Sequence, residues 1–237
     1  MIKETKSVKF SYAGEIDIDQ TLEKKIMDNW SDLKKKTDLL KEGKILVVSN
    51  FVKNENDYEI ELKETTFSHY MYAKTFKNSD IRCMFSGAYI ITSDNYVVAV
   101  LNNMYKGNQF EMLNLVGGMS DAKDIIDGKY SSEQCLKREF KEELGLDLIN
   151  SNYNMQLKYI KYPSENENPF GYAIDTIYEI KTEYTKMQIQ EMFENSKHDN
   201  EIKSLIFFSK ENYKDIYNFE YKKAYMPELW ENIFLNM

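Results

Sequence analysis

The sequence predicts a folded α/β protein with a mixed sheet, preceded by a small α+β unit. The 237 residues are 42% hydrophobic and 14% aromatic, which is ordinary for a globular chain and too rich for a disordered one. Segments with the two-residue period of strands alternate with segments of helical period along the chain. A polar break at 77–82, KNSDIR, separates two groups of such segments. We therefore place a boundary near residue 84, between units 1–84 and 85–237.

The first unit is expected to combine strands with two helices. The helix expected at 17–40 carries apolar residues at helical spacing, and the helix expected at 65–76 begins with threonines that can cap it. A polar turn, KNEND, joins two strand-like runs into a hairpin. The strands are expected at 7–12, 44–51 and 58–64.

The second unit opens with a hairpin of two buried-looking strands, 88–92 and 96–103. The short strand 112–118, MLNLVGG, ends in paired glycines. A helix is expected at 131–145, with Ser131 as its N-cap and Gly145 as its stop. Further strands are expected at 153–162, 171–180 and 205–209, and further helices at 186–195 and 226–236, the last with Pro227 at its start.

Charge and composition narrow the function classes. The net charge of −8 gives no general attraction to nucleic acid or to an anionic membrane. No run of about 18 apolar residues is present and the first residues lack a signal-peptide pattern, so a cytoplasmic protein without a membrane partner is expected. Cys83 and Cys135 are expected to be reduced core thiols. Two histidines leave little room for a histidine-based metal centre.

The segment REFKEELGL, residues 138–146, concentrates negative charge on one helix face. Glu139, Glu142 and Glu143 are spaced i, i+3 and i+4, so their carboxylates repel, and Arg138 can pair with Glu142. A solvated charged face is the simple explanation. An apolar stripe beside the acids would instead dock the helix and turn the acids toward a cleft. Together with the carbonyl oxygens of the paired glycines, three carboxylates resemble the oxygen shell that Mg²⁺ prefers.

Gly118 and the segment 138–146 resemble the Nudix box, whose pattern is G, five residues, E, seven residues, R-E-U-x-E-E-x-G-U, where U is bulky and apolar. The second half matches at every specified position. The resemblance implies a Nudix α/β/α sandwich and a diphosphatase that cleaves a nucleoside diphosphate linked to another group. It implies Mg²⁺ or Mn²⁺ held by Glu139, Glu142, Glu143 and the Gly117 or Gly118 carbonyl, with Arg138 orienting a glutamate.

The first half of the motif departs from the family pattern. Arg138 follows Gly118 by 20 positions, six more than the pattern has, and counting back eight from Arg138 reaches Tyr130 instead of a glutamate. In the family that glutamate supports the loop more than it binds metal. Asp121, Asp124 or Asp127 could take over its role, and the sequence does not choose among them.

The resemblance also points to a late loop. Many family members add a glutamate just before a late strand, and Glu201 stands a few residues ahead of the strand expected at 205–209. An exposed loop acid without a role is the alternative. His198 could contact phosphate, although a loop histidine without a function explains it equally simply.

The layout of the first unit is similar to that of the Nudix hydrolases that split UDP-glucose and UDP-galactose. A nucleotide sugar is therefore the leading substrate class. Thr66, Phe67 and Tyr70 could line its base or sugar pocket, because aromatic rings stack on bases, while packing is the alternative use of Phe67. Hydrolysis of mRNA caps, ADP-ribose or other nucleotides stays open, and the acidic balance argues against the cap. A non-catalytic nucleotide-binding module and a structural charged helix are the remaining alternatives.

Overall fold

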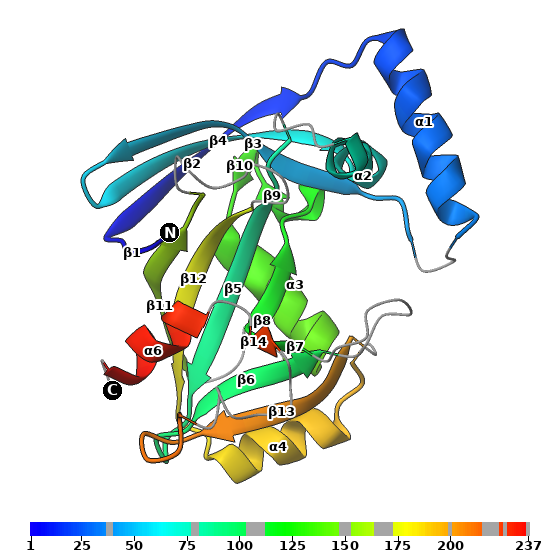
Figure 1. Ribbon diagram of the computed structural model, residues 1–237. Helices are drawn as coiled ribbons and strands as arrows, with labels where there is room; N and C mark the ends of the chain where they lie inside the picture. The colour runs from blue at the N-terminus through cyan, green and yellow to red at the C-terminus, as the bar shows by residue number, and fades with distance from the viewer. Residues whose placement is uncertain are drawn as a thin grey trace.

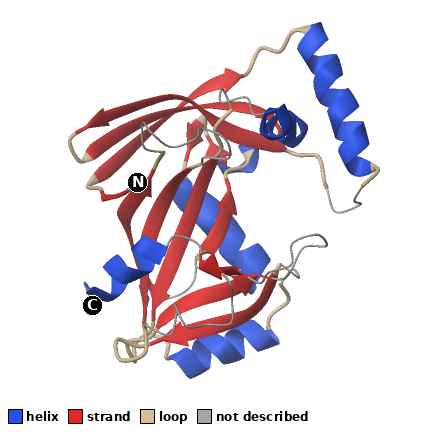
Figure 2. Cartoon of the chain, in the orientation of Figure 1, coloured by secondary structure: helices blue, strands red, loops and turns tan. Residues whose placement is uncertain are grey.

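The computed structural model describes residues 1–36, 40–76, 81–102, 112–146, 153–163, 173–198, 201–214, 223–224 and 227–235. These residues form a large mixed sheet and a smaller three-stranded sheet, with helices beside both (Figures 1 and 2). The predicted α/β class with a mixed sheet is confirmed. No helix within the described ranges is long and apolar enough to cross a membrane.

The small sheet and two helices form the N-terminal unit. Strand β4 (Asp57–Thr66) lies between β2 (Ser7–Glu15), to which it is parallel, and β3 (Lys44–Asn54), to which it is antiparallel. Helix α1 (Gln20–Lys34) begins later than the predicted 17–40, because the Asp19 side chain caps it at its start, and residues 37–39 of that prediction lie outside the described residues. Helix α2 (Phe67–Phe76) begins after Thr66, whose hydroxyl oxygen accepts a hydrogen bond from the His69 N–H as a cap would.

The large sheet is built around a parallel pair. Strand β12 (Ile174–Thr182) pairs in parallel with β5 (Met84–Ile91) and antiparallel with β11 (Tyr153–Lys161). On the other side, β5 pairs antiparallel with β6. The remaining strands of this sheet are β1 (Ile2–Glu4), β6 (Val97–Asn102), β7 (Met112–Asn114), β8 (Val116–Met119), β13 (Ile202–Phe208) and β14 (Lys223–Ala224).

Alternate residues of the central strands belong to two hydrophobic cores, one on each face of the sheet. Val98 and Val100 of β6 face the core that contains residues of α3 (Ser132–Leu144) and α4 (Lys186–Asn195). Val97 and Ala99 face the opposite core, which α6 (Pro227–Leu235) covers. This two-residue alternation puts helices on both faces of the sheet. The predicted α/β/α sandwich is confirmed (Figure 1).

A third core joins the N-terminal unit to the large sheet. Tyr58 and Leu62 of β4 pack in one buried cluster with Met84 of β5 and Ile160 of β11. Strand β1 also lies in the large sheet, where it pairs with β11. The boundary near residue 84 stays a prediction. The chain passes between the two units at least twice.

The elements that the sequence did not predict are short. Apart from β1 and β14, they follow Gly118: a 3₁₀ turn at Ala122–Asp124 and a hairpin of β9 (Ile125–Ile126) and β10 (Lys129–Tyr130). Strands of two or three residues are too short to show a hydrophobic period, which explains why they escape a pattern search.

The shared core predicts that the two units unfold together. Leu62→Ala should lower the free energy of unfolding of the whole chain by about 3 kcal/mol, because it opens a cavity beside Met84 and Ile160. Urea denaturation followed by circular dichroism and by tryptophan fluorescence should give one transition at a lower midpoint. The control Val52→Ala removes a side chain that is 38% exposed and should change stability by less than about 0.5 kcal/mol. Two separate transitions would contradict a joint core.

Candidate active site

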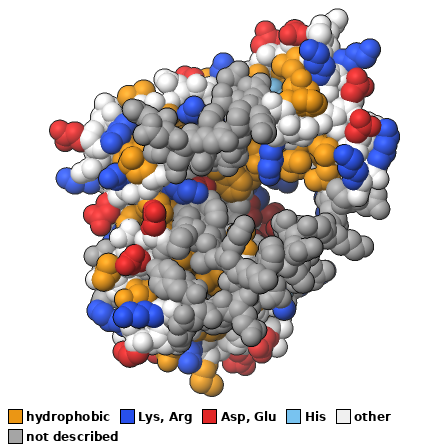
Figure 3. Space-filling model, viewed as in Figure 1, with side chains coloured by type: hydrophobic (Ala, Val, Ile, Leu, Met, Phe, Trp, Pro, Cys, Tyr) orange, Lys and Arg blue, Asp and Glu red, His pale blue; other side chains and the backbone are white. Residues whose placement is uncertain are grey.

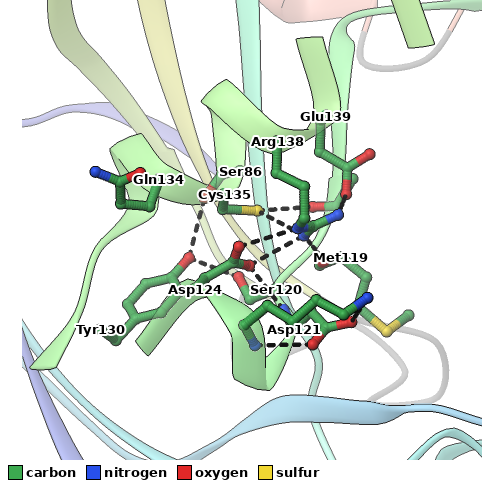
Figure 4. Close-up of polar contacts among 12 residues, drawn as sticks. Ser86, Met119, Ser120, Asp121, Asp124, Tyr130, Gln134, Cys135, Arg138 and Glu139 are labelled. Atoms are coloured by element: carbon green, nitrogen blue, oxygen red, sulfur yellow. Dashed lines mark hydrogen bonds and ion pairs between the residues drawn. The ribbon is translucent and has the colours of Figure 1, made fainter. Parts of the chain in front are cut away.

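Helix α3 is fixed at both ends and along one face. The Ser131 hydroxyl oxygen accepts a hydrogen bond from the Gln134 N–H, and Gly145 ends the helix in the left-handed conformation, so both predicted boundaries are confirmed. Leu136 and Phe140 are fully buried against the sheet. Because these two residues lie against the sheet, the helix face that carries Arg138 and the acids is directed toward the loop that follows β8 (Figure 4).

Arg138 is the centre of the polar contacts in this region. Its Nε and Nη2 each donate a hydrogen bond of 3.0 Å to one carboxylate oxygen of Asp124, and Nη2 also donates to the Met119 carbonyl at 3.1 Å. Its Nη1 donates to Glu139 at 2.6 Å and to Glu142 at 3.2 Å, which confirms the predicted pair with Glu142. Burial alone would lower the pKa of Arg138, but Asp124 and Glu139 raise it above its ordinary value. The guanidinium therefore stays charged.

Asp124 stands at the position of the motif glutamate, for which the sequence alone offered three aspartates. Among the three aspartates, it is the one whose carboxylate forms a two-pronged ion pair with Arg138, and its side chain is 2% exposed. It also accepts the Asp121 N–H at 2.8 Å, which tightens the 3₁₀ turn. Counting forward from Gly118, five residues precede Asp124, which is the spacing of the motif glutamate. The six extra residues therefore come after this acid, and a forward count would have found it.

Tyr130 does not replace the motif glutamate. Its hydroxyl lies 2.6 Å from the Ser120 hydroxyl and 3.2 Å from the Ser86 hydroxyl, and burial raises its pKa well above the ordinary value. The edge of its ring meets Phe10 of β2, with 4.8 Å between the ring centres. Tyr130 of the β9–β10 hairpin thus links the loop of Asp124 to Ser86 of the large sheet (Figure 4). Its contact with Phe10 links the same loop to the sheet of the N-terminal unit.

The paired glycines bring the backbone against the acids. The Gly117 N–H donates a 3.0 Å hydrogen bond to Glu143, which is 4% exposed. Gly117 has φ +139°, and a Cβ there would lie 2.1 Å from the Ser86 carbonyl oxygen. A Cβ on Gly118 would lie 2.5 Å from the carboxylate carbon of Glu139. A side chain on Gly117 would therefore force β8 away from β5, whereas one on Gly118 would displace the Glu139 carboxylate.

The three glutamates differ in their surroundings. Burial raises the pKa of Glu139 to about 7, and the neighbouring Arg138 acts in the opposite direction. Glu142 is exposed, whereas Glu143 is buried. In the described part of the chain, no three side chains of His, Cys, Asp or Glu are already arranged around a metal position. The acids instead hold Arg138 and the Gly117 N–H, and their oxygens are the donor type that hard divalent cations take.

A cavity of about 550 Å³ is lined by residues of β1, β11, β12 and β5, and a second, of about 480 Å³, lies beside the glycines. Gly117 and Gly118 line the second one together with residues of α2, β5 and β12. Figure 3 shows the molecule hollowed between the part that carries α1 and α2 and the part that carries the large sheet. The cavity and the glutamates therefore lie on two sides of the same short strand, β8.

The other predicted site residues fall into two regions. Phe67 packs edge to face on Trp30 of α1, while Tyr70 lines the cavity beside the glycines. The Thr66 hydroxyl lies 2.9 Å from that of Ser68.

His198 stacks on Phe193 of α4, with 4.3 Å between the ring centres. Glu201 is exposed and immediately precedes β13. The functional roles of these two residues stay predictions. Both cysteines are buried, as predicted, and Arg138 Nη2 lies 3.6 Å from the Cys135 sulfur.

The chain can be compared with family models, with curated proteins and with solved structures. No family model matches the sequence, and no curated protein sequence matches it. Among solved structures, this chain is similar to a protein from Deinococcus radiodurans (16% identity, 64% of this chain and 82% of that one, TM-score 0.43). It is also similar to a NUDIX hydrolase from Nitrosomonas europaea (16%, 64% and 86%, TM-score 0.42) and to the MutT protein from Methanosarcina mazei (13%, 65% and 91%, TM-score 0.40).

The ion pair between Arg138 and Asp124 predicts a stability difference between two matched variants. Asp124→Asn should lower the free energy of unfolding by about 3 kcal/mol, because it removes the charge that a mostly buried guanidinium faces. Asp127→Asn should change it by less than about 0.5 kcal/mol, because Asp127 is exposed and Asn tolerates its positive φ. Urea denaturation measures both. Equal effects in the two variants would show that Asp124 does not hold Arg138.

Proposed function

We propose that this chain is a Nudix hydrolase that uses a divalent cation to cleave the diphosphate of a nucleoside diphosphate linked to another group. The observation that carries the proposal is the arrangement around Arg138. One edge of its guanidinium holds Asp124, and Nη1 gathers the carboxylates of Glu139 and Glu142 at one point. A solvated charged helix face would need neither this partly buried arginine with its four acceptors nor the close approach of Gly118 to Glu139.

The residues that would hold Mg²⁺ or Mn²⁺ are Glu139, Glu142, Glu143 and a carbonyl of Gly117 or Gly118. Such a cation supplies charge neutralisation on the diphosphate and a water of lowered pKa. The chain itself positions the carboxylates. Packing of α3 fixes where they leave the helix, and the glycine backbone limits how far Glu139 and Glu143 can move.

Asp124 makes it feasible for Glu139 and Glu142 to turn from Arg138 to a cation. A buried guanidinium that loses its partners is costly. Arg138 would keep its two bonds to Asp124 and its bond to the Met119 carbonyl after both glutamates leave Nη1. Arg138 therefore acts as a positioning residue for the glutamates. Glu201, before β13, is proposed as an additional acid of the site, and His198 as a phosphate contact.

The leading substrate is a nucleotide sugar such as UDP-glucose. A cavity of about 480 Å³ beside the glycines is large enough for one ring-containing part of such a molecule. Phe67 is assigned to packing because it meets Trp30, and the aromatic residues that line the pocket are Tyr70 and Phe85. ADP-ribose, mRNA caps and other nucleotides are the alternative substrates.

Turnover should depend equally on Glu142, which is exposed, and on Glu143, which is buried. Glu142→Gln and Glu143→Gln should each lower kcat by about 100-fold or more, because each removes a charge that faces the cation and the diphosphate. The assay incubates the protein with Mg²⁺ and UDP-sugars, ADP-ribose, dinucleoside polyphosphates or capped RNA, and detects phosphatase-sensitive products.

Glu133→Gln is the matched control for this experiment. Glu133 is an exposed acid in the first turn of the same helix, and its replacement should leave kcat unchanged. Unchanged turnover in the Glu142 and Glu143 variants would disprove the metal-dependent mechanism. Cation binding without turnover of any substrate would favour a non-catalytic binding module.

The close contact at Gly118 predicts a separate effect on cation binding. Gly118→Ala should weaken Mg²⁺ binding by about tenfold or more, since the added methyl group displaces the Glu139 carboxylate. The wild-type thermal midpoint should rise with added MgCl₂, and this rise should shrink in Gly118→Ala. Gly43→Ala, at a position where a Cβ meets nothing within 4 Å, should keep the full rise. A full rise in Gly118→Ala would remove Glu139 from the set of ligands.

A further inference from the structure

The cavity beside the glycines receives a lysine from the N-terminal unit. Lys74, in the last turn of α2, lines it together with Tyr70, and its Nζ lies 5.9 Å from the centre of the Tyr70 ring. At this distance an ammonium group is attracted to the face of an aromatic ring. Burial raises the pKa of the Cys83 thiol, which also lines the cavity, and the positive charge of Lys74 acts in the opposite direction. The ammonium group of Lys74 therefore lies at the wall of the cavity.

Lys74 leaves this cavity with an excess of positive charge. Among the described residues that line it, the charged ones are Lys74, Lys161 and Asp175. Nζ of Lys161 lies 3.3 Å from Oδ2 of Asp175, so these two charges offset each other. Within the described part of the chain, Lys74 forms no ion pair with an acid. A negatively charged group is therefore the ligand that this wall favours.

The cavity and the proposed cation site are separated by glycines without side chains. Gly117 and Gly118 line the cavity, while the Gly117 N–H donates to Glu143 and a Cβ on Gly118 would lie 2.5 Å from the carboxylate carbon of Glu139. A diphosphate has two phosphate groups, so one can bind the cation while the other faces the cavity. The glutamates and a diphosphate carry more negative charge than one divalent cation and Arg138 offset. A further positive charge beside the second phosphate would stabilise the complex.

We propose that Lys74 contacts the phosphate group of the substrate that faces the cavity, so that the N-terminal unit supplies part of the active site. Lys74 is a compact charge that donates hydrogen bonds to phosphate oxygens. It acts from α2, whereas the glutamates act from the other side of β8. The inference rests on the proposed function and adds to it a residue that contacts the substrate.

Binding of a diphosphate that cannot be hydrolysed tests this contact. Methylene diphosphonate, in which a CH₂ group replaces the bridging oxygen, is titrated into the full chain with excess MgCl₂ by isothermal titration calorimetry. Lys74→Met removes the charge and keeps an unbranched side chain, and it should weaken binding by about tenfold, because a hydrogen bond from a charged donor is lost. Lys74→Arg restores a charged donor and should bind within about threefold of the wild type.

Two further measurements separate a direct contact from a structural role. The affinity of the wild type should fall as KCl is added, and this fall should be shallower in Lys74→Met, because one charge pair is missing. Because Lys74 is exposed, its replacement should leave the thermal midpoint of the free protein unchanged. Lys25 is exposed on α1, outside the described lining of the cavity, so the control Lys25→Met should keep the affinity and the salt dependence of the wild type.

The possible outcomes separate this inference from the proposed function. Wild-type affinity and salt dependence in Lys74→Met, or no binding of the diphosphonate to the wild type, would overturn the inference. If Glu142→Gln abolishes Mg²⁺-dependent turnover while Lys74→Met binds the diphosphonate like the wild type, the assignment of Lys74 is wrong and the proposed hydrolysis stands. If binding depends on Lys74 but no substrate is turned over, the proposed hydrolysis is wrong and the assignment stands.

Discussion

The ion pair between Arg138 and Asp124 is the interaction on which the arrangement of the site depends. It joins helix α3 to the 3₁₀ turn after β8 through two hydrogen bonds of 3.0 Å. Because Asp124 occupies one edge of the guanidinium, the opposite nitrogen is left to collect Glu139 and Glu142. A partly buried arginine with this many acceptors is costly to disturb, which gives the acidic helix face a fixed geometry.

The surrounding structure supports this ion pair from both units of the chain. The β9–β10 hairpin follows Asp124 directly, and Tyr130 at its end contacts Ser120, Ser86 and Phe10. The N-terminal unit is thus packed against the loop that carries Asp124. The same unit supplies α2 to the cavity on the other side of β8. Its position can therefore influence both the glutamates and the group that the cavity would take.

The sequence predicted those features that depend on local spacing. The i, i+3 and i+4 glutamates, the caps of α3 and the pair of Arg138 with Glu142 are all local, and the structure confirms the caps and the pair. The sequence could not single out Asp124, because the position of the six extra residues between Gly118 and Arg138 was unknown. The sequence predicted Tyr70 as a pocket residue, but the contributions of Gly117 and Asp175 to the cavity could not be predicted, since the three residues come from distant segments. Strand β1 is too short to show a period.

The central claim is that the glutamates of α3 form a divalent-cation site. Titration of the protein with Mn²⁺, with the free ion followed by electron paramagnetic resonance, tests it most directly because it requires neither a substrate nor turnover. We expect the wild type to remove Mn²⁺ from solution in a saturable manner, and the double variant Glu139→Gln, Glu142→Gln not to do so. Saturable binding of equal affinity in the double variant, or no binding in the wild type, would contradict it.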